Sequence, residues 1–237
     1  MIFSFNLLYS ISIVTLLIVI TVLLTIFMPK PKSYFDAKLC PELNHLVSYF
    51  TDIQSELSEF IKQYDDSNTD DSNTDDSNTD DSNTVVLYNK YEGKSKLQSS
   101  KLSKKFSNIP ISWLVLRSIP NVVRVGIVSI KKKYKAPEVM GNHLNSNKFL
   151  RVLFPINISG GKKSGIWVNG ETKLFEEGKI IIYDNSHINS IYNKHKRKET
   201  VLLAIDLIRP SHISHGISDT KVQDIFPVIN KSETKKN

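Results

Sequence analysis

Cysteine is almost absent from this sequence, and the single residue, Cys40, limits the chemistry that the chain can support. One cysteine cannot form an intrachain disulfide, and it cannot build a metal site from several thiolates. A chain without disulfides fits a reducing compartment. The apolar content of 40% in 237 residues allows a hydrophobic core, so the sequence is compatible with one domain of moderate size plus attached segments.

Charged side chains are missing from residues 1–29, where the run from Leu7 to Met28 is almost continuously apolar. As a helix rising ~1.5 Å per residue, this run reaches roughly 33 Å, enough to span the hydrocarbon core of a bilayer. A cleaved signal peptide would have a basic start, a shorter apolar run and a small-residue cleavage site, and the segment has none of these. The sequence therefore predicts a transmembrane helix over residues 1–29 that is retained as a single-pass anchor in the lipid bilayer.

The orientation of this anchor follows from the basic residues beside it. Lys30, Lys32 and Lys38 follow the apolar run, and no basic residue precedes it. Basic flanks are retained on the cytoplasmic side of membranes, so the charge bias predicts a body that faces the cytoplasm.

Lys and Arg are missing from residues 65–84, which repeat the sequence DDSNT four times and contain eight Asp. Asp, Ser, Asn and Thr favour turns and cannot build a core. The repeat also lacks the glycine turn and the bidentate Glu of a calcium-binding loop. We therefore predict a disordered acidic spacer over residues 65–84.

The rest of the chain is strongly basic, since the net charge of +7 becomes 31 − 16 = +15 without these eight Asp. A basic body suggests an anionic neighbour such as a membrane surface, an acidic substrate or nucleic acid. The excess is spread over short runs at 131–133, 194–198 and 235–236, which favours a solvated Lys-rich surface and disfavours nucleic acid.

Residues 41–64 place apolar side chains at steps of three and four, beginning at Leu43 and ending at Tyr64. This spacing predicts an amphipathic helix, opened by Pro41, whose apolar face packs on the core domain. From residue 108 the pattern changes to short apolar runs separated by Gly, Asn and Lys. The expected strands are Val122–Ile130, Phe149–Ile156, Gly165–Val168, Lys179–Tyr183 and Val201–Leu207.

These strands indicate a mainly β domain over residues 108–211, arranged as an antiparallel sandwich or barrel. Residues 212–237 are expected to form a polar tail.

Several blocks, in their order and spacing, resemble the aspartyl/asparaginyl β-hydroxylase family. The matching blocks are SIPNVVRVGIVSI, FLRVLFPI, GIWVNGETKLFEEGKIIIYDNS, YN at 192–193 and VLLAIDLIRP. The resemblance implies a double-stranded β-helix, or jelly-roll, with the helix at 41–64 on its flank. It also implies iron(II) and 2-oxoglutarate as cofactors and, by family analogy, a body on the lumenal side of a membrane.

The chemical positions of the family are occupied by other residues here. The resemblance places Leu153, two residues after Arg151, at the first iron-binding histidine and Asn189 at the second. Thr200 stands for the arginine that binds 2-oxoglutarate, and Trp167 stands for a second arginine. Leu153 has no lone pair, an Asn amide oxygen is a poor ligand for iron(II), and Thr200 cannot grip a carboxylate with two hydrogen bonds.

Displaced ligands are the alternative. If the strand is extended from residue 187 to 189, His187 faces the same interior as Asn189, one step of ~7 Å along. His143 lies in the loop before the strand of Arg151 and could complete a His143/His187 pair.

The first hypothesis is therefore a membrane-anchored family member that has lost catalysis and binds a peptide, an anionic ligand or a protein partner. The alternative is an active iron(II)/2-oxoglutarate dioxygenase with a rearranged metal site that hydroxylates a protein or lipid side chain. A third class is a purely structural protein whose interior is filled by Leu153, Trp167 and their neighbours.

Overall fold

The computed structural model describes residues 13–23, 32–68, 82–89, 107–135, 148–158 and 163–213. The chain divides into two units, Met1–Lys32 and Ser33–Asn237. In the first unit residues 13–23 form a helix. Within the described ranges, no helix combines the length and the apolar character needed to cross a bilayer. Residues 1–12 and 24–29 of the predicted anchor lie outside those ranges.

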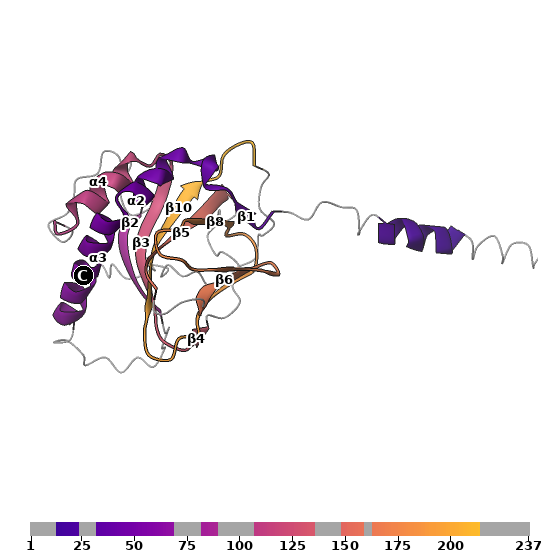
Figure 1. The fold of residues 1–237 in the computed structure, drawn as a ribbon. Coiled ribbons are helices and arrows are strands. Elements are labelled where there is room, and N and C mark those ends of the chain that lie inside the picture. The colour runs from indigo at the N-terminus through magenta and orange to yellow at the C-terminus, as the bar shows by residue number, and fades with distance from the viewer. Residues whose placement is uncertain are drawn as a thin grey trace, which may run out of the picture. The chain divides into compact units, whose positions relative to one another are not determined.

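The second unit is built on a six-stranded antiparallel sheet with the order β1-β8-β5-β10-β3-β2 (Figure 1). Its strands are β1 (Tyr34–Phe35), β8 (Ile181–Asp184), β5 (Phe149–Asn157), β10 (Thr200–Ile208), β3 (Val122–Ile130) and β2 (Ser82–Asn89). The long strands β5, β10 and β3 lie in the middle and are almost entirely buried. Burial on both faces explains why their sequences are mostly apolar and do not alternate between apolar and polar residues.

A second, four-stranded sheet has the order β4-β9-β6-β7 and is also antiparallel. Its strands are β4 (Tyr134–Lys135), β9 (Asn189–Asn193), β6 (Ser164–Val168) and β7 (Glu171–Leu174). Side chains from both sheets form one apolar cluster, which we call the inter-sheet core. It includes Val128, Leu153, Ile166, Ile191 and Ala204. The observed architecture is therefore mainly β, with two antiparallel sheets enclosing an apolar interior.

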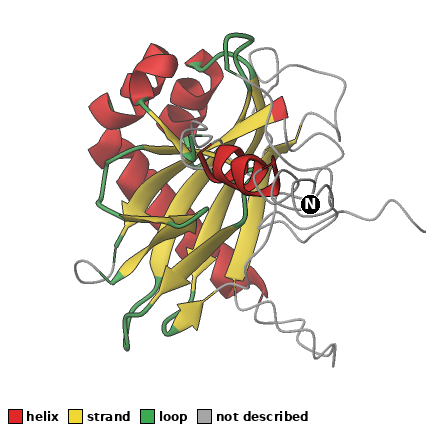
Figure 2. Ribbon diagram, turned by 90° about the vertical axis from the view of Figure 1, so that its right-hand side faces the viewer, coloured by secondary structure: helices red, strands yellow, loops and turns green. Residues whose placement is uncertain are grey.

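The other face of the six-stranded sheet is covered by helices, which gather along one side of the strands in Figures 1 and 2. They are η1 (Ala37–Leu39), η2 (Pro41–Leu43), α2 (Asn44–Ser48), α3 (Phe50–Asn68) and α4 (Pro110–Ser118). Leu43, Leu46, Ile53 and Leu57 are fully buried in a second cluster, together with sheet residues such as Phe154. The segment 41–64 thus packs on the sheet through its apolar face.

Three expected boundaries are corrected. The segment 41–64 is not one helix, because Tyr49 leaves helical geometry (φ −104°, ψ 22°) between α2 and α3. The predicted spacer 65–84 is shorter, since α3 continues to Asn68 and β2 begins at Ser82, where it pairs with β3. The strands of the domain also begin well before residue 108, because β1 and β2 belong to its larger sheet, whereas the expectation that the segment 41–64 packs on this domain agrees with the structure.

Residues 69–81, between the two elements that bound the spacer, lie outside the described ranges. The structure describes only the first residues of the predicted polar tail. There, Ile213 packs against the apolar cluster between the helices and the six-stranded sheet.

Candidate functional site

The inter-sheet core occupies the place where the resemblance puts a metal. Leu153 on β5 is fully buried there, opposite Ile181 on β8 and Ala204 on β10. Residues two apart on a strand share a face, so Arg151 points to the same interior. At its first expected ligand position the interior therefore presents a fully buried aliphatic side chain that belongs to an apolar cluster.

Arg151 is bound to a carboxylate on the neighbouring strand. Its Nε lies 2.7 Å from Oδ1 of Asp206 and its Nη2 lies 3.0 Å from Oδ2. Arg124 on β3 donates to the same carboxylate through its Nε (2.8 Å) and Nη2. The three side chains are at most 4% exposed, so they form a buried ion-pair cluster, which we call the Asp206 cluster. Its hydrogen bonds are charge-assisted and geometrically fixed, as buried charges require.

Asn189, at the second expected ligand position, begins β9 and is 2% exposed. It pairs with Val168 and lies on the same face as Ile191, so it does face the interior. Its Nδ2 donates to the backbone carbonyl of His187 at 2.9 Å. The amide thus closes the turn that precedes β9.

Thr200, at the expected co-substrate position, begins β10 opposite Ile130 and is fully buried. Its Oγ1 has no hydrogen-bond partner among the described residues, and neither has the buried Oγ of Ser164 on β6. A lone hydroxyl offers neither the charge nor the paired donors that hold a carboxylate. Trp167 is only half-buried and alternates with Ile166 and Val168, which puts it on the outer face of the four-stranded sheet.

His187 lies where sequence reasoning did not place it. β8 ends at Asp184 and β9 begins at Asn189, so the residues between form a turn in which the His187 N–H donates to the Asp184 carbonyl (3.2 Å). The displaced-ligand alternative assumed an extended strand from residue 187 to 189, but the backbone forms a turn there, so the alternation of faces does not apply to His187. The imidazole is 2% exposed and its Nε2 lies 3.9 Å from Oδ2 of Asp184.

The Asp184 carboxylate beside this imidazole is already engaged. Its Oδ1 accepts from Arg209 Nη2 (2.6 Å) and from the backbone N–H (2.9 Å) and hydroxyl (2.6 Å) of Ser186. Burial lowers the pKa of His187; the nearby Asp184 carboxylate opposes this shift and the Arg209 guanidinium adds to it. His187 is therefore kept neutral, without a hydrogen-bond partner for Nε2 among the described residues. His143 lies outside those residues.

Iron(II) and 2-oxoglutarate do not fit the residues at these positions. Iron of this class needs neutral imidazoles and a carboxylate on one face, with open positions beside them. Leu153 offers no donor atom, and Asn189 and Thr200 offer only neutral oxygen or amide groups. Across the described ranges, no three His, Cys, Asp or Glu side chains come together to hold a metal ion.

Sequence reasoning missed the roles of the family-like residues that are present. Asp206 and Arg209 belong to the block VLLAIDLIRP, Arg151 to FLRVLFPI and Asp184 to KIIIYDNS. All four form buried ion pairs between strands or strand ends. The signal that could have revealed them is a charged residue inside a run that is otherwise apolar, because such a residue needs a buried partner.

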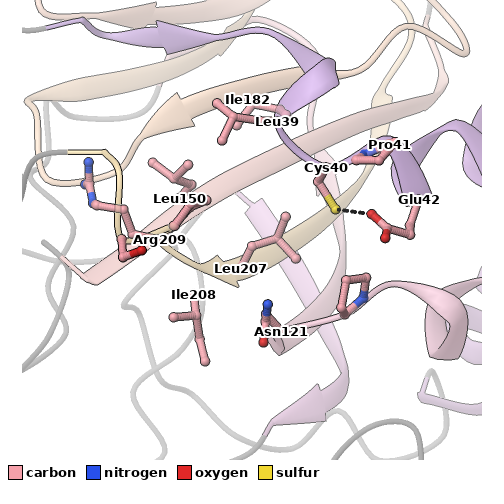
Figure 3. A pocket seen from close by; sticks show the side chains of 13 residues that line it. Leu39, Cys40, Pro41, Glu42, Asn121, Leu150, Ile182, Leu207, Ile208 and Arg209 are labelled. Atoms are coloured by element: carbon pink, nitrogen blue, oxygen red, sulfur yellow. Dashed lines mark hydrogen bonds between the residues drawn. The ribbon is translucent and has the colours of Figure 1, made fainter.

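A pocket of about 450 Å³ opens on the other side of the six-stranded sheet, between the strand ends and η1–η2. Leu150, Ile182 and Leu207 form its apolar floor, with Arg209 and Cys40 on opposite sides (Figure 3). The Cys40 thiol donates to Glu42 Oε2 at 3.4 Å. Burial and this carboxylate raise the pKa of the thiol to about 11, so it stays protonated and is a poor nucleophile.

The fold is mainly β, with two antiparallel sheets that enclose an apolar interior, and the strand motifs lie on those sheets. The family model for aspartyl/asparaginyl β-hydroxylase matches residues 47–210, well over half of the sequence. The chain belongs to the aspartyl/asparaginyl β-hydroxylase family. A comparison with curated proteins gave no match.

Solved structures similar to this chain include cupin and dioxygenase domains. The cupin domain of Cnp3 from Schizosaccharomyces pombe is 16% identical, with a TM-score of 0.30 over 38% of this chain and 58% of that chain. A salicylate 1,2-dioxygenase from Pseudaminobacter salicylatoxidans is 10% identical, with a TM-score of 0.34 over 64% of this chain and 32% of that chain. The chain thus spans about a third to three fifths of these two proteins.

Proposed function

We propose that this chain is a family member whose iron and 2-oxoglutarate centre has been replaced by packing, and that it acts by binding. The observation that carries this proposal is the position of Leu153, which is fully buried in the inter-sheet core where the family resemblance places the first histidine. The geometry of Arg151 supports it, because this side chain is held by Asp206 and is committed to the fold.

The binding site that we propose is the pocket beside Cys40. Its apolar floor and volume of about 450 Å³ fit one or two apolar side chains of a peptide or a partner protein. Glu42 and Asn121 at its edge offer polar groups that would orient the backbone of such a ligand. We further propose that residues 1–29 anchor the protein in a membrane as a single pass, because they carry no charged side chain and are almost continuously apolar from Leu7 to Met28.

The alternative function, an active dioxygenase with displaced ligands, would depend on His187. One observation favours it, since Nε2 of His187 is buried without a partner among the described residues. The neighbouring carboxylate argues against it, because Asp184 is bound by Arg209 and Ser186.

A metal titration of the full chain in detergent micelles separates the two functions. We expect no stoichiometric binding of iron(II), or of cobalt(II) as its spectroscopic substitute, and no succinate from 2-oxoglutarate. Stoichiometric binding that His187→Ala abolishes would overturn the proposal. The binding function is tested separately with displayed peptides selected on the wild-type chain. Ser211→Trp, at the exposed rim of the pocket, should abolish their binding, and selected peptides that bind this variant equally well would refute the pocket.

A further inference from the structure

Two basic runs that are far apart in the sequence lie together at one end of the sheets. The segment 131–135 follows β3, residue 163 precedes β6, and the segment 194–198 joins β9 to β10. Backbone hydrogen bonds join the three, from Lys133 N to His195 O (3.0 Å) and from Lys194 N to Lys163 O (2.8 Å). We call this region the basic surface. Its nine members are Lys131, Lys132, Lys133, Lys135, Lys163, Lys194, Lys196, Arg197 and Lys198.

The charge of the basic surface is concentrated. All its members are exposed except Lys131, which is half-buried. Glu199 is the one acidic residue within the segments 131–135, 163 and 194–199, and its carboxylate accepts from the Ser129 hydroxyl at 3.0 Å. Like charges held so close raise the local potential and attract an anionic ligand.

The acidic repeat of the same chain ends beside this surface. β2 begins at Ser82, directly after Asp80 and Asp81, and Ser82 pairs with Ile130. Ile130 directly precedes the basic run that begins at Lys131. Ile130 also pairs with Thr200, which lies two residues after the basic run 194–198. The sheet register therefore fixes the end of the repeat next to both basic runs.

The length of the repeat suits contact with this surface. Thirteen residues, 69–81, separate the end of α3 from the start of β2 and carry six of the eight Asp. Such a segment spans at most ~45 Å when fully extended, so its carboxylates cannot move far from their point of attachment. A short tether of this kind holds its ligand at millimolar effective concentration.

We propose that the basic surface binds the DDSNT repeat of its own chain. The repeat supplies carboxylates and no positive charge, and the surface supplies the complementary cations. A free polyanion such as RNA or an anionic vesicle must then displace the repeat before it can bind. The proposal does not depend on the loss of iron chemistry, because it involves the opposite end of β10 from the Asp206 cluster.

Zero-length carbodiimide coupling of carboxylates to amines tests the contact directly on the full chain. At 20 mM NaCl we expect cross-links between the repeat and lysines of the basic surface. Their yield should fall about fivefold at 0.5 M NaCl, because the screening length shrinks from roughly 20 Å to about 4 Å. A mixture of ¹⁴N- and ¹⁵N-labelled chains should give cross-links within single chains. Cross-links only between chains, or none to these lysines, would refute binding in cis.

A variant without charge over residues 69–81 supplies the matched control. The variant keeps the length of the chain and replaces six carboxylates by amides, as D70N, D71N, D75N, D76N, D80N and D81N. Acetylation of the basic surface should increase in this variant, whereas acetylation of the exposed Lys179 on the loop before β8 should not. The variant should also bind a fluorescent oligouridylate and vesicles with 30% phosphatidylserine at least tenfold more tightly than the wild type. Equal acetylation, or equal binding by both chains, would overturn the proposal.

Discussion

Arg151 and Asp206 occupy paired positions on β5 and β10, and their side chains meet through two hydrogen bonds of 2.7 and 3.0 Å inside the protein. Arg124 reaches the same carboxylate from β3, so one acidic side chain joins three adjacent strands. The pair explains why the otherwise apolar run FLRVLFPI contains a charged residue, Arg151. Leu153, the next residue on the same face of the strand, is apolar. Its role is structural, which has a direct consequence for stability.

Replacing the shared carboxylate should be severely destabilising. Asp206→Asn leaves two buried guanidinium groups without their counter-ion, and breaking a buried pair in this way costs about 3–5 kcal/mol. Urea unfolding of the full chain measures the loss. Glu176→Gln is the matched control, because it removes an ion pair with Lys179 whose side chains are 59% and 69% exposed. That change should cost less than about 0.5 kcal/mol. Equal losses in the two variants would contradict a structural role for the Asp206 cluster.

The sequence predicted the three central strands of the larger sheet well and missed several other strands, including the eight-residue β2. β3, β5 and β10 are long apolar runs, and their predicted ranges differ from the structure by at most one residue at each end. β1 and β4 have two residues each and three of the four residues of β7 are polar, so no local periodicity marks them. Such strands form because longer neighbours offer hydrogen-bond partners, which is a tertiary effect.

The candidate site shows the same division. The resemblance placed Leu153 at an interior position of a regular strand, and in the structure Leu153 lies in the inter-sheet core. The direction of the His187 side chain could not be predicted from the alternation of faces along a strand, because a turn lies between β8 and β9. The basic runs at 131–133 and 194–198 were interpreted as separate solvated segments, since only the pairing of β4 with β9 brings them together.

The buried imidazole of His187 should make stability depend on pH. Burial lowers the pKa of this histidine below the value of about 6.5 that it has in the unfolded chain. As pH falls below about 6.5, the unfolded state binds a proton that the folded state does not, so the free energy of unfolding decreases until pH passes the lowered pKa. His187→Gln should remove up to one proton from this dependence in denaturation curves between pH 5 and 7.5.

The control for this measurement is His45→Gln, since His45 is exposed and its Nδ1 lies 2.9 Å from the Ser118 hydroxyl. This variant should retain the steeper slope of the wild type. An unchanged slope in His187→Gln would show that another group governs the pH dependence.

Leu153 should behave as a core residue. Leu153→Ala removes buried methyl groups from the inter-sheet core and should cost about 2–5 kcal/mol in the free energy of unfolding. Leu114→Ala is the same substitution on the outer face of α4, where the side chain is 69% exposed, and should change stability by less than about 0.5 kcal/mol. A loss below 1 kcal/mol for Leu153→Ala would instead indicate a loosely packed interior with room for a ligand.

Glu56 on α3 should stabilise the start of α4. Its Oε1 accepts the backbone N–H of Ile111 (2.9 Å), and its Oε2 accepts the N–H and hydroxyl of Ser112 (both 2.7 Å). A carboxylate at the first turn of a helix satisfies unpaired N–H groups and complements the helix dipole. Glu56→Ala should therefore cost about 2 kcal/mol, measured by urea unfolding.

The matched control lies one turn further along the same helix. Glu59 is exposed and accepts only a weak bond from Gln63 at 3.3 Å, so Glu59→Ala should cost less than about 0.5 kcal/mol. Because α3 and α4 together cover the six-stranded sheet, the Glu56 variant should also lose protection from hydrogen exchange in α4 before the central strands. Simultaneous loss in α4 and β10 would mean that the helices and the sheet unfold as one unit, and the local role of Glu56 would then be refuted.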